Sequence, residues 1–128
     1  MKNSSFKSPN SSKIFTKDWK PETSLDLNIS HSDVDKGLFE VVLSVAITAS
    51  NEGMPAFEVE VDQAAIFQIE GFPEQHLLEA LGAACPSVMF PYLRETIDHL
   101  LIKGGYPPLM IAPINFDALY ADTQRKSA

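Results

Sequence analysis

A chain of 128 residues has the length of one domain and can build one hydrophobic core. Hydrophobic residues make up 45% of the sequence and charged residues 21%, a globular composition that argues against a wholly disordered chain. The net charge of −7 disfavours binding to nucleic acid or to an anionic membrane surface, because both call for a basic face.

The acidic residues are concentrated in the first half of the chain. Between Glu22 and Glu70 there are ten acidic residues and one basic residue, Lys36. An acidic surface can steer a basic partner or keep a sticky protein soluble, and composition alone favours the second interpretation.

Targeting and redox features indicate a cytosolic protein. No stretch is long and apolar enough to span a membrane, so no insertion into the bilayer is expected. Residues 1–12 are polar and lack the apolar core of a secretory signal. The single cysteine, Cys85, excludes an internal disulfide, which fits a reducing cytoplasmic location.

The first half of the chain is predicted to be β-structure. Residues 1–13 are polar and are expected to form a loose arm or a short edge strand. Apolar and polar residues alternate through 22–33, 38–50 and 56–69, which is the period of half-buried strands. Turns are predicted at 35–37 and 51–55. The sequence therefore predicts an antiparallel sheet with one apolar face and one acidic face.

The second half is predicted to be helical. After residue 73 the apolar residues recur every three or four positions, interrupted by Pro86 and Pro91. We predict a short helix near 74–84 and a longer one near 87–103, bent where they meet. An apolar, proline-rich loop over 106–113 follows, and Asn115 is expected to cap a final helix over about 115–125. The predicted fold class is α+β, with the helices following the sheet.

Candidate catalytic and metal-binding residues are few and scattered. Cys85 lies in an apolar helical stripe, whereas a nucleophilic cysteine needs an electropositive, partly open site. His31 is expected to be solvated at a strand end. His76 and Glu79 are one helical turn apart and lack the further ligands that a metal needs. Asp98-His99 is predicted to be an exposed pair. We therefore expect no catalytic site, no metal site and no cofactor.

Apolar residues in predicted loops are more unusual. Trp19 precedes a strand, Phe72-Pro73 interrupts the chain, and residues 106–111 are apolar. Because loops lie on surfaces, this apolar area must meet the core, a sister subunit or a ligand. Folding back onto the core is at least as probable as binding on composition alone.

Three stretches of the sequence resemble the SecB family of bacterial export chaperones. They are FTKDWKPE at 15–22, LGAACPSVMFPYLRE at 81–95 and PPLMIAPINFDALY at 107–120. FEVVL at 39–43 and IFQIEG at 66–71 extend the resemblance, which runs from about Phe15 to Tyr120. It is carried by long and unusual motifs.

The resemblance implies a fold and an assembly. The fold is a single domain over residues 1–128, with a four-stranded antiparallel sheet followed by two helices, the first bent at Pro86 or Pro91. Residues 121–128 would end the last helix and form a short tail. The assembly is a homotetramer, a dimer of dimers, in which edge strands pair across one interface and long helices pack across the other. Subunit packing is expected to use Val59, Val61 and Gln63.

The function implied by the resemblance is that of an ATP-independent holding chaperone, not an enzyme. It would bind unfolded precursor proteins in apolar grooves, keep them competent for translocation and deliver them to the export ATPase SecA. The residues expected to contact clients are Trp19, Leu25, Leu27, Phe67, Phe90, Leu93, Ile97, Pro107, Leu109 and Met110. The residues expected to dock SecA are Glu58, Glu60 and Asp62.

Several positions depart from the family pattern near the SecA site. Asn3 and Lys7 stand where the family carries acidic residues, and Glu58 stands where better-known members carry an apolar one. The printed sequence ends in 125–128 (RKSA) where the family has an acidic tail. The alternative is a SecB-like paralogue that holds clients or a dedicated partner with weak or no SecA docking. A small enzyme is a third, lower-ranked hypothesis.

Overall fold

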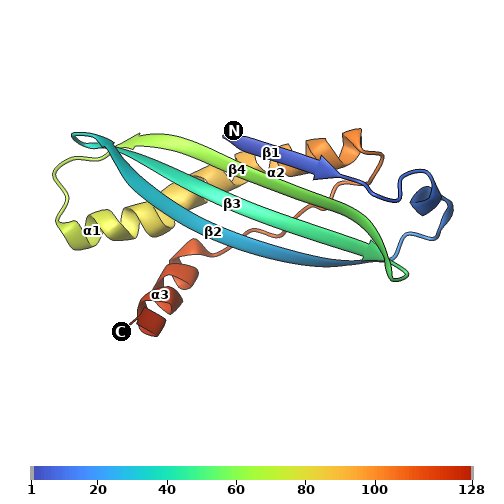
Figure 1. The fold of residues 1–128 in the computed structure, drawn as a ribbon. Helices are drawn as coiled ribbons and strands as arrows, with labels where there is room; N and C mark the ends of the chain where they lie inside the picture. Colours follow the sequence, from blue (N-terminus) through green and yellow to red (C-terminus); the bar gives the residue numbers. More distant parts are fainter. Residues whose placement is uncertain (1, 128) are drawn as a thin grey trace.

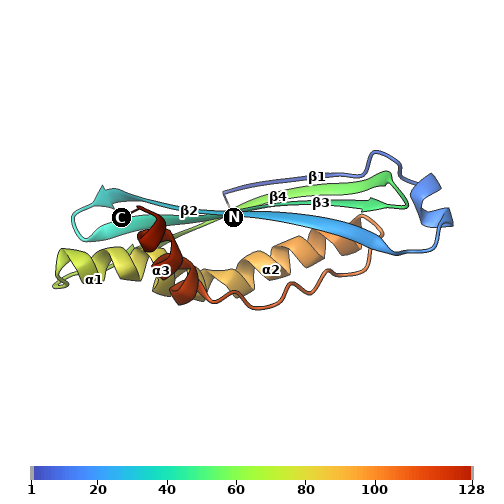
Figure 2. The same cartoon turned by 90° about the horizontal axis from the view of Figure 1, so that it is seen from below.

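The computed structural model describes residues 2–127, with side chains through residue 123. Met1, Ala128 and the side chains of residues 124–127, within the predicted end and tail at 121–128, lie outside the described residues. A four-stranded antiparallel sheet has the order β1-β4-β3-β2. Its strands are β1 (Asn3–Lys7), β2 (Pro21–Asp35), β3 (Leu38–Asn51) and β4 (Met54–Gln68). The helices are α1 (Glu74–Glu79), α2 (Cys85–Lys103) and α3 (Phe116–Ser127), and they lie on one side of the sheet (Figures 1 and 2). The predicted α+β architecture is confirmed.

The N-terminal segment is a strand rather than a loose arm. Residues Asn3–Lys7 pair antiparallel with β4 and form one edge of the sheet. A single turn of 3-10 helix, η1 (Lys13–Thr16), follows and leads into β2 (Figure 1). Of the two alternatives for residues 1–13, the described part therefore adopts the edge strand.

Two-residue turns join the three long strands. Lys36-Gly37 links β2 to β3, and Gly37 has a φ of 72°. Glu52-Gly53 links β3 to β4 with φ values of 53° and 77°, the left-handed pair that fits the twist of a hairpin. The loop predicted at 51–55 is thus shorter than expected, since Asn51 and Met54 are already paired. Pro55 lies inside β4, beside a register irregularity that tolerates its missing N–H.

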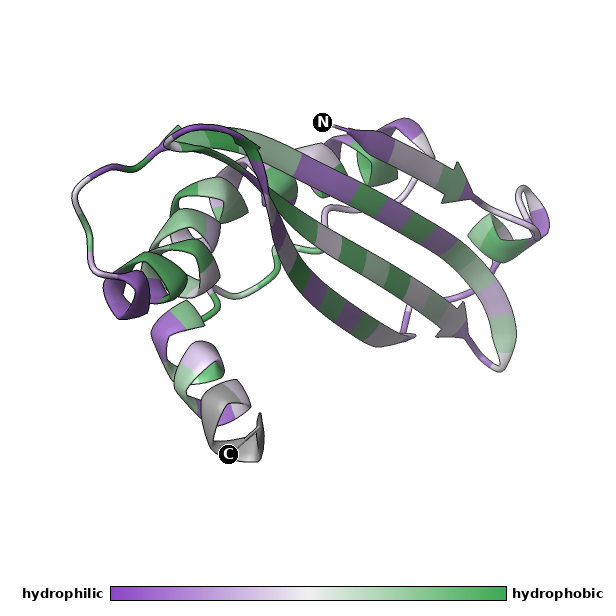
Figure 3. Cartoon of the chain, turned by 60° about the vertical axis from the view of Figure 1, so that its left-hand side comes forward, coloured by the Kyte–Doolittle hydropathy of each residue, from purple (hydrophilic) through white to green (hydrophobic). Residues whose placement is uncertain are grey.

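The predicted alternation along the strands is confirmed, and Figure 3 shows it as alternating apolar and polar bands. On β3, Val41, Leu43, Val45 and Ile47 are buried beneath the helices, while the residues between them lie on the open face. Burying one face in this way removes apolar area from water, the main favourable term in folding. The opposite face of the sheet is left without a helical cover (Figure 2).

The first helical run is continuous from Glu74 to Lys103, where two helices over 74–84 and 87–103, bent where they meet, were predicted. A π-helical segment, η2 (Ala80–Ala84), connects α1 to α2 directly before Pro86. Proline removes a helical hydrogen bond and clashes with the preceding turn, and a wider π turn accommodates both effects. The hydroxyl of Ser87 donates to the carbonyl of Ala83 at this junction (2.8 Å). Pro91 lies within α2.

The end of α2 and the start of α3 both follow local capping rules. Gly105 has a φ of 92° and donates to Ile102, while Tyr106 donates to Leu101 (2.9 Å), the pair of bonds typical of a Schellman motif. A connecting loop, defined here as residues 104–115, then runs back alongside α2 (Figures 1 and 2). The predicted cap of α3 is confirmed, because the Ala118 N–H donates to the Asn115 side chain (3.0 Å).

The core lies between the sheet and α2. One face of α2 is buried at positions spaced by four, from Cys85 through Met89, Leu93 and Ile97 to Leu101. Among residues 2–127, no helix has both the length and the apolarity to cross a bilayer.

Candidate functional site

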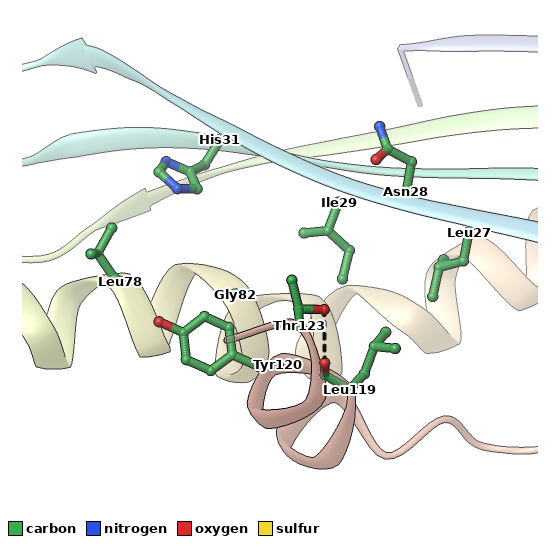
Figure 4. A pocket seen from close by; sticks show the side chains of 9 residues that line it. All are labelled: Leu27, Asn28, Ile29, His31, Leu78, Gly82, Leu119, Tyr120 and Thr123. Carbon is green, nitrogen blue, oxygen red and sulfur yellow. Dashed lines mark hydrogen bonds between the residues drawn. The ribbon is translucent and has the colours of Figure 1, made fainter. Parts of the chain in front are cut away.

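A cavity of about 430 Å³ lies between the edge strand β2, the start of the helical run and α3 (Figure 4). Leu27 and Ile29 point from β2 toward Leu119 and Tyr120 of α3, and Leu78 of α1 lies at one end. This cavity is called the α3 groove. It is lined by Leu27, Asn28, Ile29, His31, Leu78, Gly82, Leu119, Tyr120 and Thr123.

The α3 groove depends on a close approach at Gly82. A Cβ added to Gly82 would lie 2.5 Å from Cδ2 of Tyr120, so glycine is what allows α3 to pack against η2. The hydroxyl of Thr123 donates to the Leu119 carbonyl within α3 (3.0 Å; Figure 4). That bond satisfies the hydroxyl of Thr123, so the side of α3 that faces β2 presents chiefly apolar surface.

An aromatic cluster occupies the far end of the molecule from α3. Tyr106 is its hub, with ring centroids 5.0 Å from Phe57 and 5.3 Å from Trp19. Its hydroxyl donates to the buried carbonyl of Ala56 (2.8 Å). The cluster consists of Phe6, Phe15, Trp19, Phe57 and Tyr106.

Trp19 is held in this cluster by the segment around it. The side chain of Asn51 is fully buried, accepts the Lys20 N–H (2.8 Å) and donates to the Asp18 carbonyl (2.8 Å). Both neighbours of Trp19 are thus tied to the β3 end, and its indole is half-buried. The apolar loop segment at Trp19 therefore packs largely against its own protomer.

The connecting loop is attached to α2 by the carboxylate of Asp98. The sequence analysis predicted that Asp98 and His99 form an exposed pair. Oδ1 of Asp98 accepts the backbone N–H of Leu109 (3.0 Å) and of Met110 (3.4 Å), and Asp98 is half-buried. Met110 has a φ of 54° and is 75% exposed. The expectation that Asp98 lies exposed was wrong, because its partner is loop backbone whose position no helical pattern reveals.

The predicted client-contact residues differ in accessibility within the protomer. Three are core residues of α2, buried against the sheet or the start of α3, and direct contact with a client would require these elements to separate. The others are accessible wholly or in part, and Leu27 also lines the α3 groove. Phe90, Leu93 and Ile97 are buried; Trp19, Leu27, Phe67 and Leu109 are half-buried; Leu25, Pro107 and Met110 are exposed.

Most of the α3 groove was missed by sequence reasoning. Leu78, Leu119 and Tyr120 come from α1 and α3, far from Leu27 in the chain. The available signal was the motif containing Leu119 and Tyr120 at the end of the family resemblance. The sequence did not reveal that these two side chains face β2, because this depends on how α3 packs in the tertiary structure.

The open face of the sheet carries the predicted SecA residues. Glu58, Glu60 and Asp62 are side by side on β4, and this surface, together with Asp26 of β2, is called the acidic face. A shallow cavity of about 290 Å³ lies here over β2, β3 and β4. Its lining includes Asp26, Asn28, Ser44, Ala46, Glu60 and Asp62.

Basic side chains from the N-terminus border the acidic face. In the β1–β4 register, Lys7 is opposite Glu58, where unlike charges attract across the strands. Lys2 forms an ion pair with Glu40 (2.8 Å). Lys7 and Glu58, two of the residues that depart from the family pattern, are therefore adjacent in space. The positive charge of Lys7 partly cancels the negative potential of Glu58.

The outer face of α2 is a third exposed surface. Val88, Tyr92, Glu95, His99 and Ile102 recur every three or four residues on the side away from the core, and Tyr92 is 63% exposed. A cavity of about 400 Å³ adjoins it, lined partly by Gln63 of β4. This α2 outer stripe, as these five residues are called, presents apolar and polar groups together.

The three predicted interface residues behave differently in the protomer. Val59 and Val61 are each 1% exposed and belong to its core, so their side chains have almost no area left to bury against a second subunit. Gln63 lies at the edge of that core. Its Oε1 is buried and has no hydrogen-bond partner among the described residues, an arrangement that leaves an acceptor for a group from outside.

The chemistry of the described residues gives no support for nucleophilic catalysis. Cys85 is buried, and desolvation raises the pKa of its thiol, the opposite of what a reactive thiolate requires. Within residues 2–127, no three His, Cys, Asp or Glu side chains are grouped to hold a metal ion.

Comparison with known proteins identifies relatives over nearly the whole chain. The family model of the preprotein translocase subunit SecB matches residues 1–127. A protein-export protein SecB from Hahella chejuensis is 47% identical over 126 residues, covering 98% of this chain and 79% of the relative. One from Methylococcus capsulatus is 49% identical over 120 residues, covering 94% and 77%.

A solved structure shares the fold. It is a Mycobacterium tuberculosis SecB-like chaperone in complex with a ChAD peptide from an antitoxin, with a TM-score of 0.72. The match covers 88% of this chain and 83% of that chain at 16% sequence identity, so it bears on the fold alone.

Proposed function

The chain belongs to the SecB family of protein-export chaperones, and we propose that it holds unfolded precursor proteins on the helix side of its sheet while the open side docks the export ATPase SecA. Holding requires no ATP, because binding is driven by burial of apolar client surface, at roughly 25 cal/mol per Å² before entropy costs. A folded protein hides that surface, so the chaperone selects clients that have not yet folded.

The observation that carries this proposal is the α3 groove. Leu27, Leu78 and Leu119 line it and remain at least partly accessible in the protomer. Apolar side chains gathered in one accessible groove, unlike single exposed apolar residues, mark a binding site. The acidic face lies on the other side of the sheet (Figure 2), so that a client and the motor need not compete for the same surface.

Client binding is tested by titrating an unfolded, non-folding precursor against matched variants. Leu119→Ser removes an apolar wall of the α3 groove, while Val34→Ser removes an exposed apolar residue at the far end of β2. Partial burial of a leucine contributes about 1 kcal/mol, so we expect Leu119→Ser to weaken binding about fivefold. Equal effects of the two substitutions would argue against a specific groove.

Docking of SecA is proposed to use Glu60 and Asp62 of the acidic face, with Glu58 partly neutralised by Lys7. Family members dock SecA partly through its basic, zinc-bearing tail, which complements an acidic surface. Glu60→Lys should weaken binding of that tail in calorimetry and leave client affinity unchanged. An unchanged tail affinity would count against this face as the docking site.

A second candidate function is a SecB-like paralogue that holds clients or a dedicated partner with weak or no SecA docking. The Lys2–Glu40 ion pair and the Lys7–Glu58 juxtaposition favour it, because both reduce negative charge where a basic tail would bind. Lys7→Glu separates the two candidates: tighter tail binding by this variant would show a docking site weakened by Lys7. No tail binding by either form, with client binding intact, would support the paralogue.

The proposed assembly is a homotetramer, a dimer of dimers. β1 has a free outer edge in the protomer, which pairing with a second β1 would satisfy. The α2 outer stripe and the unpartnered Gln63 Oε1 fit a helix-to-helix interface. Val59 and Val61 would then support the interface indirectly, by fixing the position of the β4 backbone, and their side chains would not contact the second subunit. Sedimentation at micromolar concentration should give a tetramer, and Tyr92→Glu should give a dimer.

The cytoplasm is the proposed location. Client capture has to precede translocation, and the single buried Cys85 has no need of an oxidising compartment. Fractionation that recovered the chain outside the cytoplasm would contradict this assignment.

A further inference from the structure

Asp98 occupies an unusual place for an acidic residue. It lies in the second-last turn of α2, near the negative end of the helix dipole, and aspartate is among the poorer helix formers. Neither local preference explains its presence there. Its contacts are with the connecting loop, eleven and twelve residues further along the chain.

The contact fixes two successive peptide groups of that loop. One carboxylate oxygen accepts from both the Leu109 N–H and the Met110 N–H, at 3.0 Å and 3.4 Å. Hydrogen bonds to an ionised acceptor are stronger than neutral ones, and the half-buried position of Asp98 shields them from water. The loop is otherwise rich in proline, which has no N–H to donate.

The geometry at Met110 makes this attachment informative. Met110 has a φ of 54°, a conformation that residues with a Cβ rarely adopt and that asparagine or glycine tolerates better. It reverses the direction of the side chain, so that Met110 is 75% exposed while Leu109 and Ile111 on either side pack against the core. A strained backbone that persists needs surrounding contacts to hold it.

We propose that Asp98 is a positioning residue, which holds the connecting loop in the conformation that presents the Met110 side chain to an extended apolar segment of the unfolded client. This inference rests on the proposed holding function. A flexible, polarisable thioether suits a partner whose side chains vary from one client to the next. Asp98 itself does not contact the client.

The test uses the full-length assembly with three variants. Asp98→Ala removes the acceptor, Asp98→Asn keeps an Oδ1 acceptor without the charge, and Met110→Asn keeps a residue that tolerates the left-handed backbone while deleting the apolar side chain. Two quantities are measured for each: hydrogen exchange at the amides of Leu109 and Met110, and the affinity for an unfolded precursor.

Asp98→Ala should speed exchange at both amides at least tenfold and weaken client binding about fivefold. Asp98→Asn should recover most of the amide protection and most of the affinity. Met110→Asn should weaken client binding by a similar factor while the amides stay protected. A loss of client affinity with the amides still protected in Met110→Asn would show that the Met110 side chain itself binds the client. A purely structural role of the loop would not produce this result.

The inference is overturned if Asp98→Ala deprotects the loop without changing client affinity, or leaves exchange unchanged. Leu119→Ser serves as the independent arm. If it weakens client binding while the Asp98 and Met110 variants do not, the holding function stands and the positioning role falls. If the wild-type assembly binds no unfolded precursor, both fall together.

Discussion

Substituting Gly82 by alanine should destabilise the wild-type protein but stabilise a Tyr120→Ala variant. The added Cβ would lie 2.5 Å from Cδ2 and 2.7 Å from Cε2 of Tyr120. Carbon atoms in contact prefer about 3.5–4.0 Å, so the Tyr120 ring must retreat by roughly 1 Å. The ring is anchored in α3, and its displacement would therefore lift α3 and open the α3 groove.

Two opposing terms set the size of the effect. Overpacking costs about 1–3 kcal/mol, while replacing glycine by alanine inside a helix contributes about 0.5–1 kcal/mol of stability. We expect Gly82→Ala to lower the free energy of unfolding by about 1 kcal/mol. In a Tyr120→Ala background the clash is absent. Gly82→Ala should there raise the free energy of unfolding by about 0.5 kcal/mol.

The assay is urea denaturation of all four proteins at one fixed protein concentration, since subunit association also contributes to apparent stability. The coupling between the two sites is read from the double-mutant cycle. A Gly82→Ala effect of the same sign and size in both backgrounds would refute the reasoning. It would mean that α3 does not depend on the close approach at Gly82.

Three further outcomes are expected. Tyr106→Phe removes the hydroxyl bonded to the buried Ala56 carbonyl and should cost about 1–2 kcal/mol in urea denaturation, so an unchanged midpoint would contradict that bond. Asn51→Ala should free the segment around Trp19 and shift its fluorescence to the red, and an unshifted spectrum would show that the amide does not hold it. Burial raises the pKa of the Cys85 thiol, so the unfolded chain loses this proton first, and stability should fall as pH rises above the unfolded value of about 8.5. The difference between wild type and Cys85→Ala isolates that alkaline loss, and identical pH profiles would count against it.

Features set by short-range rules were predicted from the sequence. The alternation along β3 and β4 assigned each residue to the apolar or the acidic face, because successive side chains of a strand point to opposite sides. The cap at Asn115 and the end of α2 at Lys103 were predicted correctly, because both depend on local capping preferences. The edge strand β1 stayed an alternative, since its five residues include only one apolar side chain, Phe6, and carry little periodicity.

Helix continuity was predicted less well. Two prolines suggested two helices that meet in a bend near Pro86, whereas η2 joins them into one continuous helical run. The cost of a proline inside a helix depends on whether the backbone can widen and on what packs beside it. Here Tyr120 packs on the π-helical segment at Gly82, a contact between elements that no local rule connects.

The sequence by itself determined the two faces of the sheet, the order of the elements and the resemblance to a family of export chaperones. Only the tertiary structure decided that Phe90, Leu93 and Ile97 are core, that Leu27 and Leu119 share a groove, and that Asp98 holds the connecting loop. The physical reason is range. Periodicity and capping act within a few residues, whereas a groove forms where elements distant in the chain are brought together by burial of a common apolar surface.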